Sequence, residues 1–236
     1  MRDDDDKVDL STNTVSDVSD KTNRLLTTIL KTILVCGAVL ELIQGNWLAA
    51  LATIGVVIVI LLPVALSHQF DVKIPPEFEL CAVLFVMAAL FLGEVQGYYQ
   101  KFWWWDLLLH GASGLLLGIF GFLLVHVLNE KEDLHLSLKP SFVAFFAFLF
   151  ALGMGTLWEI MEFSIDQIFA TNMQKSGLND TMGDLIVDGI GAMFISILGY
   201  FYLRTIGTDS FLERWIHHFI QLNRHLFHKD NNTDAS

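Results

Sequence analysis

The stretch SFVAFFAFLFALGMGTLWEIMEFSIDQIF, residues 141–169, decides the fold. Residues 141–158 contain no charged side chain, and about 20 apolar residues suffice for an α-helix to cross the hydrocarbon core of a bilayer. The second part carries Glu159, Glu162 and Asp166, whose spacing of three and then four residues places them on one face of a helix. A membrane helix with three carboxylates near one end needs partners for them elsewhere in the chain.

The composition of the whole chain is typical of a membrane protein. Of its 236 residues, 53% are hydrophobic and 17% are charged, and the apolar residues form several long runs that a soluble domain would not carry. Because these runs are continuous rather than alternating, they predict helices and not the strands of a β-barrel. The predicted fold class is an all-α polytopic membrane helical bundle with six transmembrane helices. Their predicted ranges are 25–43, 47–66, 78–99, 106–128, 141–165 and 183–203.

The placement of Lys and Arg predicts the orientation. If the N-terminus lies inside the cell, most of these cations fall on the cytoplasmic side, and only Lys101 and Lys175 remain on the outer side. This bias follows the positive-inside rule. Both termini are therefore predicted to be cytoplasmic, with the lipid bilayer as the chain's general partner.

Composition also predicts three parts along the chain. Residues 1–24 are predicted to be a disordered acidic cytoplasmic head, and 25–204 a six-helix membrane domain. The head contains DDDDK (3–7), which matches an enterokinase-type linker, so part of it could be an engineered addition. Residues 205–236 are predicted to be an amphipathic cytoplasmic tail, because apolar pairs alternate with Arg and His there.

Acids on three predicted spans converge at one depth of the membrane. Asp106 and His110 are four residues apart at the start of the fourth span, and Asp184 and Asp188 are four apart at the start of the sixth. Glu159 lies near the end of the fifth span. Because consecutive spans run in opposite directions, all these side chains are expected near the outer boundary.

Such a cluster cannot carry its full negative charge unassisted. Two carboxylates about 5–6 Å apart repel by roughly 3 kcal/mol even at an effective dielectric constant near 20. Three solutions stay open: a bound metal ion, a proton or ion relay, or a hydrogen-bonded structural network. The metal hypothesis assigns a possible divalent ion (Mn, Mg, Ca, Fe or Zn) to one imidazole and several carboxylates. The predicted metal ligands are Asp106, His110, Glu159, Asp184 and Asp188, and the predicted catalytic residues are Glu159 and Glu162.

Three motifs resemble a known family. WWDLLLHGASG (104–114), GTLWEIMEFSIDQ (155–167) and NDTMGDLIVDGIGA (179–192) are similar, in this order, to the uncharacterised bacterial YjdF-type inner-membrane family. That resemblance implies a multi-pass protein of the bacterial cell (inner, cytoplasmic) membrane.

A weaker likeness is to the VanZ-like membrane proteins, whose members are linked to glycopeptide resistance at the cell envelope. The likeness rests on Asp106 with His110, on Glu159, and on Asp184 followed by Gly191 and Ala192. The chain departs from that family in carrying Glu162 where Gln is commoner and in lacking an Arg before Asp184. We therefore do not expect a role in glycopeptide resistance for this chain.

The sequence therefore favours a multi-pass membrane protein with an acidic and His cluster at the outer face. One expected function is a metal-dependent enzyme that acts on a lipid or lipid-linked envelope substrate. The alternatives are an ion- or proton-coupled transporter and a structural or partner-binding membrane protein. The motifs GxxxxGK[ST], GxSxG and HExxH do not occur, so the sequence does not indicate the soluble enzyme classes that these motifs mark. No nucleic-acid partner is expected.

Overall fold

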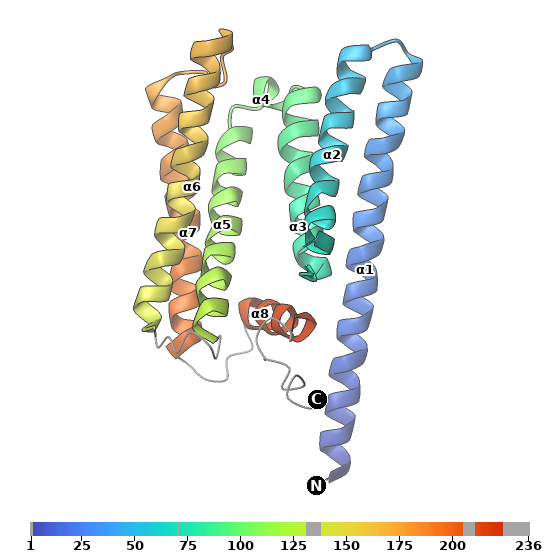
Figure 1. Cartoon of the computed structure of the whole chain (residues 1–236), viewed down its shortest axis with the longest axis vertical. Coiled ribbons are helices and arrows are strands. Elements are labelled where there is room, and N and C mark those ends of the chain that lie inside the picture. Colours follow the sequence, from blue (N-terminus) through green and yellow to red (C-terminus); the bar gives the residue numbers. More distant parts are fainter. Residues whose placement is uncertain (1, 70, 131–137, 205–210, 224–236) are drawn as a thin grey trace, which may run out of the picture. The chain divides into compact units, whose positions relative to one another are not determined.

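The structure is a computed structural model that describes residues 2–69, 71–130, 138–204 and 211–223. Within these ranges all regular secondary structure is helical, and six helices are long and apolar enough to cross a membrane, which confirms the predicted all-α bundle (Figure 1). Large apolar side chains such as Leu157, Phe163 and Ile190 are exposed on these helices. In a spanning bundle, such side chains contact lipid. The chain divides into two compact units, residues 1–98 and 99–236, which are described separately.

The first unit contains three membrane-crossing segments. These are α1 (Arg2–Ile43), α2 (Trp47–Gln69), and α3 (Pro76–Val86) continued by the π-helix η1 (Met87–Val95). Buried Leu34, Val56, Ile60 and Val83 form the core between them. The turn from α1 to α2 passes through Gly45, whose positive φ of 79° suits a residue without a side chain.

An ion pair lies inside this unit. The Nζ atom of Lys31 on α1 is 2.6 Å from Oε1 of Glu79 in the first turn of α3. Both side chains are mostly shielded, so each charge compensates the other in a setting where an unpaired charge is costly.

The third predicted span, 78–99, differs from the observed one in its ends and its geometry. The helix begins at Pro76, a position where proline is favoured because the first N–H of a helix has no partner. It widens into a π-helix over Met87–Val95, where the N–H of Gln96 donates to the carbonyl of Phe91, five residues earlier. Gly97, with a φ of 71°, then ends the segment.

Helix α1 begins at Arg2, so its bounds include most of the predicted head. Residues 1–24 contain neither Pro nor Gly, and nothing in that sequence interrupts a helix that continues outward from the membrane span. The division into a head at 1–24, a membrane domain at 25–204 and a tail at 205–236 stays a prediction.

The second unit holds the remaining spans. After the short helix α4 (Tyr98–Lys101), helices α5 (Trp105–Glu130), α6 (Pro140–Phe169) and α7 (Leu178–Arg204) run side by side, and each packs against the other two (Figure 1). A further amphipathic helix, α8 (Phe211–Leu222), falls within the predicted tail, whose residues 224–236 lie outside the described ranges.

Candidate metal centre

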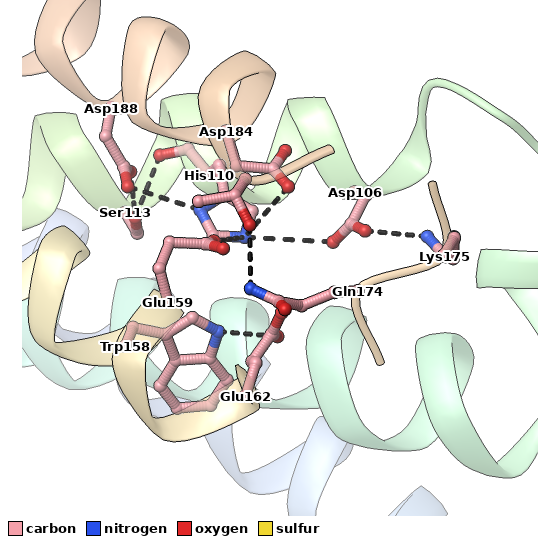
Figure 2. Close-up of polar contacts among 11 residues, drawn as sticks. Asp106, His110, Ser113, Trp158, Glu159, Glu162, Gln174, Lys175, Asp184 and Asp188 are labelled. Carbon is pink, nitrogen blue, oxygen red and sulfur yellow. Dashed lines mark hydrogen bonds and ion pairs between the residues drawn. The ribbon is translucent and has the colours of Figure 1, made fainter. Parts of the chain in front are cut away.

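The acids at the start of α5 and α7 and at the end of α6 meet at one end of the α5–α6–α7 bundle. Helices α5 and α7 begin at this end and α6 finishes there, because successive helices alternate in direction. Figure 2 shows side chains from all three helices, and from the loop between α6 and α7, turned toward one another. The convergence predicted from the sequence is therefore present in the second unit.

Glycines allow the helices to approach closely enough to build this cluster. A Cβ atom on Gly155 of α6 would collide with the carboxylate of Asp188 on α7, and one on Gly114 of α5 would collide with the backbone carbonyl of the same aspartate. Asp188 is therefore wedged between two helix backbones and is 0% exposed. This close approach of small residues is typical of helix packing in membranes.

Asp188 holds the imidazole of His110 in place. Ser113 Oγ donates to Asp188 Oδ1 over 2.7 Å, and Nδ1 of His110 lies 3.2 Å from Oδ2. A carboxylate can only accept, so a neutral His110 carries its proton on Nδ1 and presents a lone pair at Nε2. A histidine bound to a carboxylate through one nitrogen, with the other nitrogen free, is the usual arrangement of a metal-binding histidine.

The free nitrogen of His110 faces three carboxylates from three directions. Its Nε2 lies 3.7 Å from Glu159 Oε1, 3.8 Å from Asp106 Oδ1 and 4.0 Å from Asp184 Oδ2. These distances are too long for hydrogen bonds. They are close to the separation of about 3.4 Å between neighbouring ligands that a tetrahedral ion with bonds of about 2.1 Å requires. Ligand atoms of His110, Glu159 and Asp184 all lie within 4.8 Å of one another, so these groups could hold a metal ion.

Glu159 is the side chain that protein contacts satisfy least. It is 3% exposed, and neither carboxylate oxygen accepts a well-formed hydrogen bond from the described residues, although the side chains of Thr181 and Gln174 lie near enough to interact with it. A carboxylate buried without donors carries a large desolvation cost unless a proton or a cation compensates it.

The three acids of the opening stretch thus have three different environments. Glu159 faces His110, whereas Glu162 accepts a hydrogen bond of 2.8 Å from the indole Nε1 of Trp158 on its own helix. Asp166 organises the loop that follows α6 and accepts hydrogen bonds from Thr171 Oγ1 and from two backbone N–H groups, those of Met173 and Gln174.

That loop supplies a positive charge to the cluster. Lys175 Nζ lies 2.6 Å from Asp106 Oδ2 and 4.9 Å from the centre of the Tyr99 ring. Asp106 therefore offers one oxygen to the lysine and turns the other toward His110 (Figure 2). Lysine was expected on the outer side of the membrane, but sequence reasoning did not predict this pairing.

The predicted site residues thus fall into two sets. The structure brings Asp106, Glu159 and Asp184 around Nε2 of His110, while Asp188 lies on the opposite side of the ring, at Nδ1. Glu162 is one turn further along α6 and outside the group that could share an ion with His110. Sequence reasoning missed Ser113 as a partner; its spacing of three residues from His110 was the available signal.

Comparison with known proteins indicates that the chain is a membrane protein. The family model described as "Predicted membrane protein (DUF2238)" matches residues 22–205. A protein of Thermotoga maritima, described as an uncharacterized protein, is 29% identical over 135 residues, which is 57% of this chain and 66% of that protein, just under two thirds of its length. No solved structure matches the chain.

Proposed function

We propose that this chain, which belongs to the DUF2238 family of predicted membrane proteins, is a membrane metalloenzyme that hydrolyses a lipid or lipid-linked envelope substrate. Its metal ligands would be His110, Glu159 and Asp184. The family match and the six apolar helices indicate a multi-pass membrane protein. We propose in addition the bound metal, the reaction and a location in the bacterial cytoplasmic membrane. The YjdF-type resemblance of the three motifs supports that location.

The observation that carries the proposal is the position of Glu159. Its carboxylate is buried, accepts no well-formed hydrogen bond from the described residues, and has an oxygen 3.7 Å from Nε2 of His110. A network built only for structure would be expected to provide hydrogen-bond donors to such a group. A cation between Glu159, Asp184 and His110 would replace those missing donors.

The donor set also limits the kind of ion. One imidazole and two carboxylates favour a divalent transition metal such as Zn, Mn or Fe over Ca, which prefers oxygen ligands alone. Three protein ligands leave a further coordination position for water, which is the arrangement of catalytic zinc sites. Asp188 would act as a positioning residue, because it orients the histidine rather than binding the ion.

Hydrolysis then needs a proton acceptor near the water. The oxygen of water bonds to the electrophilic atom of the substrate while the bond to the leaving oxygen breaks. Glu162, one helical turn from Glu159, would take the proton from the water and pass it to the leaving oxygen. Under the predicted orientation, this chemistry takes place at the outer leaflet.

The test is the metal content of the full chain, purified in detergent. Wild type is expected to hold near-stoichiometric metal, and Glu159→Gln and Asp184→Asn to lose most of it. Glu162→Gln is the matched control, since it changes a carboxylate on the same helix, outside the ligand set. That variant should keep its metal and lose hydrolysis.

Metal retained in both ligand variants would contradict the proposal. A folded wild type that binds no metal after incubation with Zn, Mn or Fe would also contradict it. Those outcomes would favour the alternatives predicted from the sequence, an ion- or proton-coupled transporter or a structural protein.

A further inference from the structure

A groove lies between α6 and α7 in the half of the second unit away from the acids. Phe145 and Phe148 from the first turns of α6 line one side, and Ile197 and Phe201 from the last turns of α7 line the other. The groove has a volume of about 360 Å³, which falls within the range of about 300–1,000 Å³ typical of small-molecule sites. Phe145, Ile197 and Phe201 remain exposed along it, so in a spanning bundle the groove opens toward lipid chains.

One polar side chain in the lining has a hydroxyl group without a partner. Ser196 is 6% exposed, and its Oγ forms no hydrogen bond with any described residue. Ser164 on α6, by contrast, donates to the carbonyl of Ile160 one turn earlier, which is the usual solution for a serine in a membrane helix. A buried hydroxyl without a partner is costly, so Ser196 indicates an acceptor that comes from a molecule in the groove.

A cation continues the groove on the same face of α7. Arg204 follows Ile197 by seven residues and Tyr200 by four, a spacing that places all three on one helix face. Its guanidinium group donates to Oη of Tyr200 over 2.8 Å and lies 5.4 Å from the centre of that ring, which is itself part of the lining. Arg204 is exposed, and no carboxylate among the described residues forms an ion pair with it. Most of its five N–H donors are thus available to an anion at the mouth of the groove.

We propose that this groove binds an anionic glycerophospholipid. Its phosphate pairs with Arg204, an ester carbonyl accepts a hydrogen bond from Ser196, and an acyl chain lies against Phe145 and Ile197. The order of these groups along the lipid matches their order along α7. Ser196 lies one helical turn, about 5.4 Å, before Tyr200, and the ester groups lie on the chain side of the phosphate.

Charge complementarity favours an anionic over a zwitterionic headgroup. The ammonium group of a zwitterionic lipid would lie close to the guanidinium group of Arg204 and be repelled by it, whereas an anionic headgroup carries no such group. Under the predicted orientation this end of the bundle faces the cytoplasm, the side on which basic sites between membrane helices bind lipid headgroups. The inference does not depend on the proposed function, because the groove and the acids lie toward opposite ends of α6 and α7.

Native mass spectrometry of the delipidated full chain in detergent measures the affinity of the first lipid bound. The probes are dioleoylphosphatidylglycerol, which is anionic, and dioleoylphosphatidylcholine, which is zwitterionic. Wild type is expected to bind the anionic lipid about fivefold more tightly, the effect of one basic residue near an anionic lipid. Arg204→Gln should bind both lipids equally. Lys139→Gln is the matched control and should keep the preference, because Lys139 is an exposed cation at the same end of the bundle but outside the lining.

Two further variants test the remaining contacts. Ser196→Ala should weaken both lipids about fivefold, the effect of one lost hydrogen bond, and leave the preference unchanged. Ile197→Trp fills the groove from a half-exposed position, so it should fold and lower the affinity for both lipids. A monodisperse elution profile checks the folding of each variant.

The outcomes decide the proposal. Equal affinities in wild type, or a preference that survives in Arg204→Gln, overturn it. Unchanged affinities in both Ser196→Ala and Ile197→Trp overturn the groove as the binding site. Glu159→Gln, at the other end of α6, separates this site from the proposed metal centre. A preference that persists in Glu159→Gln supports the groove, and one that is lost there places the lipid at the metal centre and overturns the inference.

Discussion

The contact between Gly155 and Asp188 gives a sharp test of how the site is built. In Gly155→Ala, the added methyl carbon would overlap Oδ2 of Asp188 and lie 3.0 Å from its Cγ. The aspartate cannot simply rotate away, because Oδ1 is held by Ser113 and Oδ2 by His110. The helices must separate or these hydrogen bonds must break.

The magnitude follows from two opposing effects. Overpacking by one methyl group costs about 1–3 kcal/mol. Replacing a helical Gly by Ala stabilises the helix by up to about 1 kcal/mol. A methyl group added at Gly153, two residues earlier on α6, would meet no atom within 4 Å, so Gly153→Ala shows the second effect alone. Relative to this control, Gly155→Ala should be less stable by about 1–3 kcal/mol.

Thermal unfolding in detergent, followed by circular dichroism, measures the difference between the two variants. Metal affinity provides a second reading, since a displaced Asp188 no longer orients His110, and loss of such a partner weakens metal binding about 10–100-fold. If both alanine variants unfold at the same temperature and bind metal equally, the close packing of α6 on α7 at Asp188 is refuted.

Other predictions follow from the same contacts. Asp188→Asn should weaken metal binding about 10–100-fold without abolishing it, because the amide can present its NH₂ group to Nδ1 and favour the wrong tautomer; unchanged affinity in a metal titration would contradict the positioning role. Lys31→Met should destabilise the protein by about 1–3 kcal/mol by leaving Glu79 uncompensated, and adding Glu79→Leu should recover most of that loss in thermal unfolding. Asp166→Ala should release the α6–α7 loop and speed tryptic cleavage after Lys175 several-fold; an equal cleavage rate would show that the loop does not depend on the carboxylate.

Hydropathy and helical spacing were sufficient to predict the six spans and the side chains that meet at one end of α5, α6 and α7. The length of an apolar run is fixed by the bilayer, and a spacing of four residues places Asp106 beside His110 whatever surrounds them. The role of Asp188 was not predictable in this way. Its spacing from Asp184 is also four residues, yet one carboxylate faces Nε2 and the other Nδ1, because Gly155 and Gly114 leave space for Asp188 beside Nδ1.

The Lys175 pair and the π-helix were missed for a related reason. Lys175 reaches Asp106 only because Asp166 folds the intervening loop back, and such a contact between residues 69 positions apart leaves no periodic signal. The widened helix at Met87–Val95 has an ordinary apolar sequence, so its composition predicts only a span.

The site lies where α6 ends and where α5 and α7 begin. This position determines which of the two lipid monolayers has its headgroups near the site. A lipid held in its own monolayer brings its headgroup to only one end of the bundle. Lipids of the opposite monolayer would have to be flipped across the membrane before they could react. If the protein hydrolyses a lipid as proposed, it would therefore distinguish the two leaflets by geometry alone, and its rate in vesicles would report how fast its substrate changes sides.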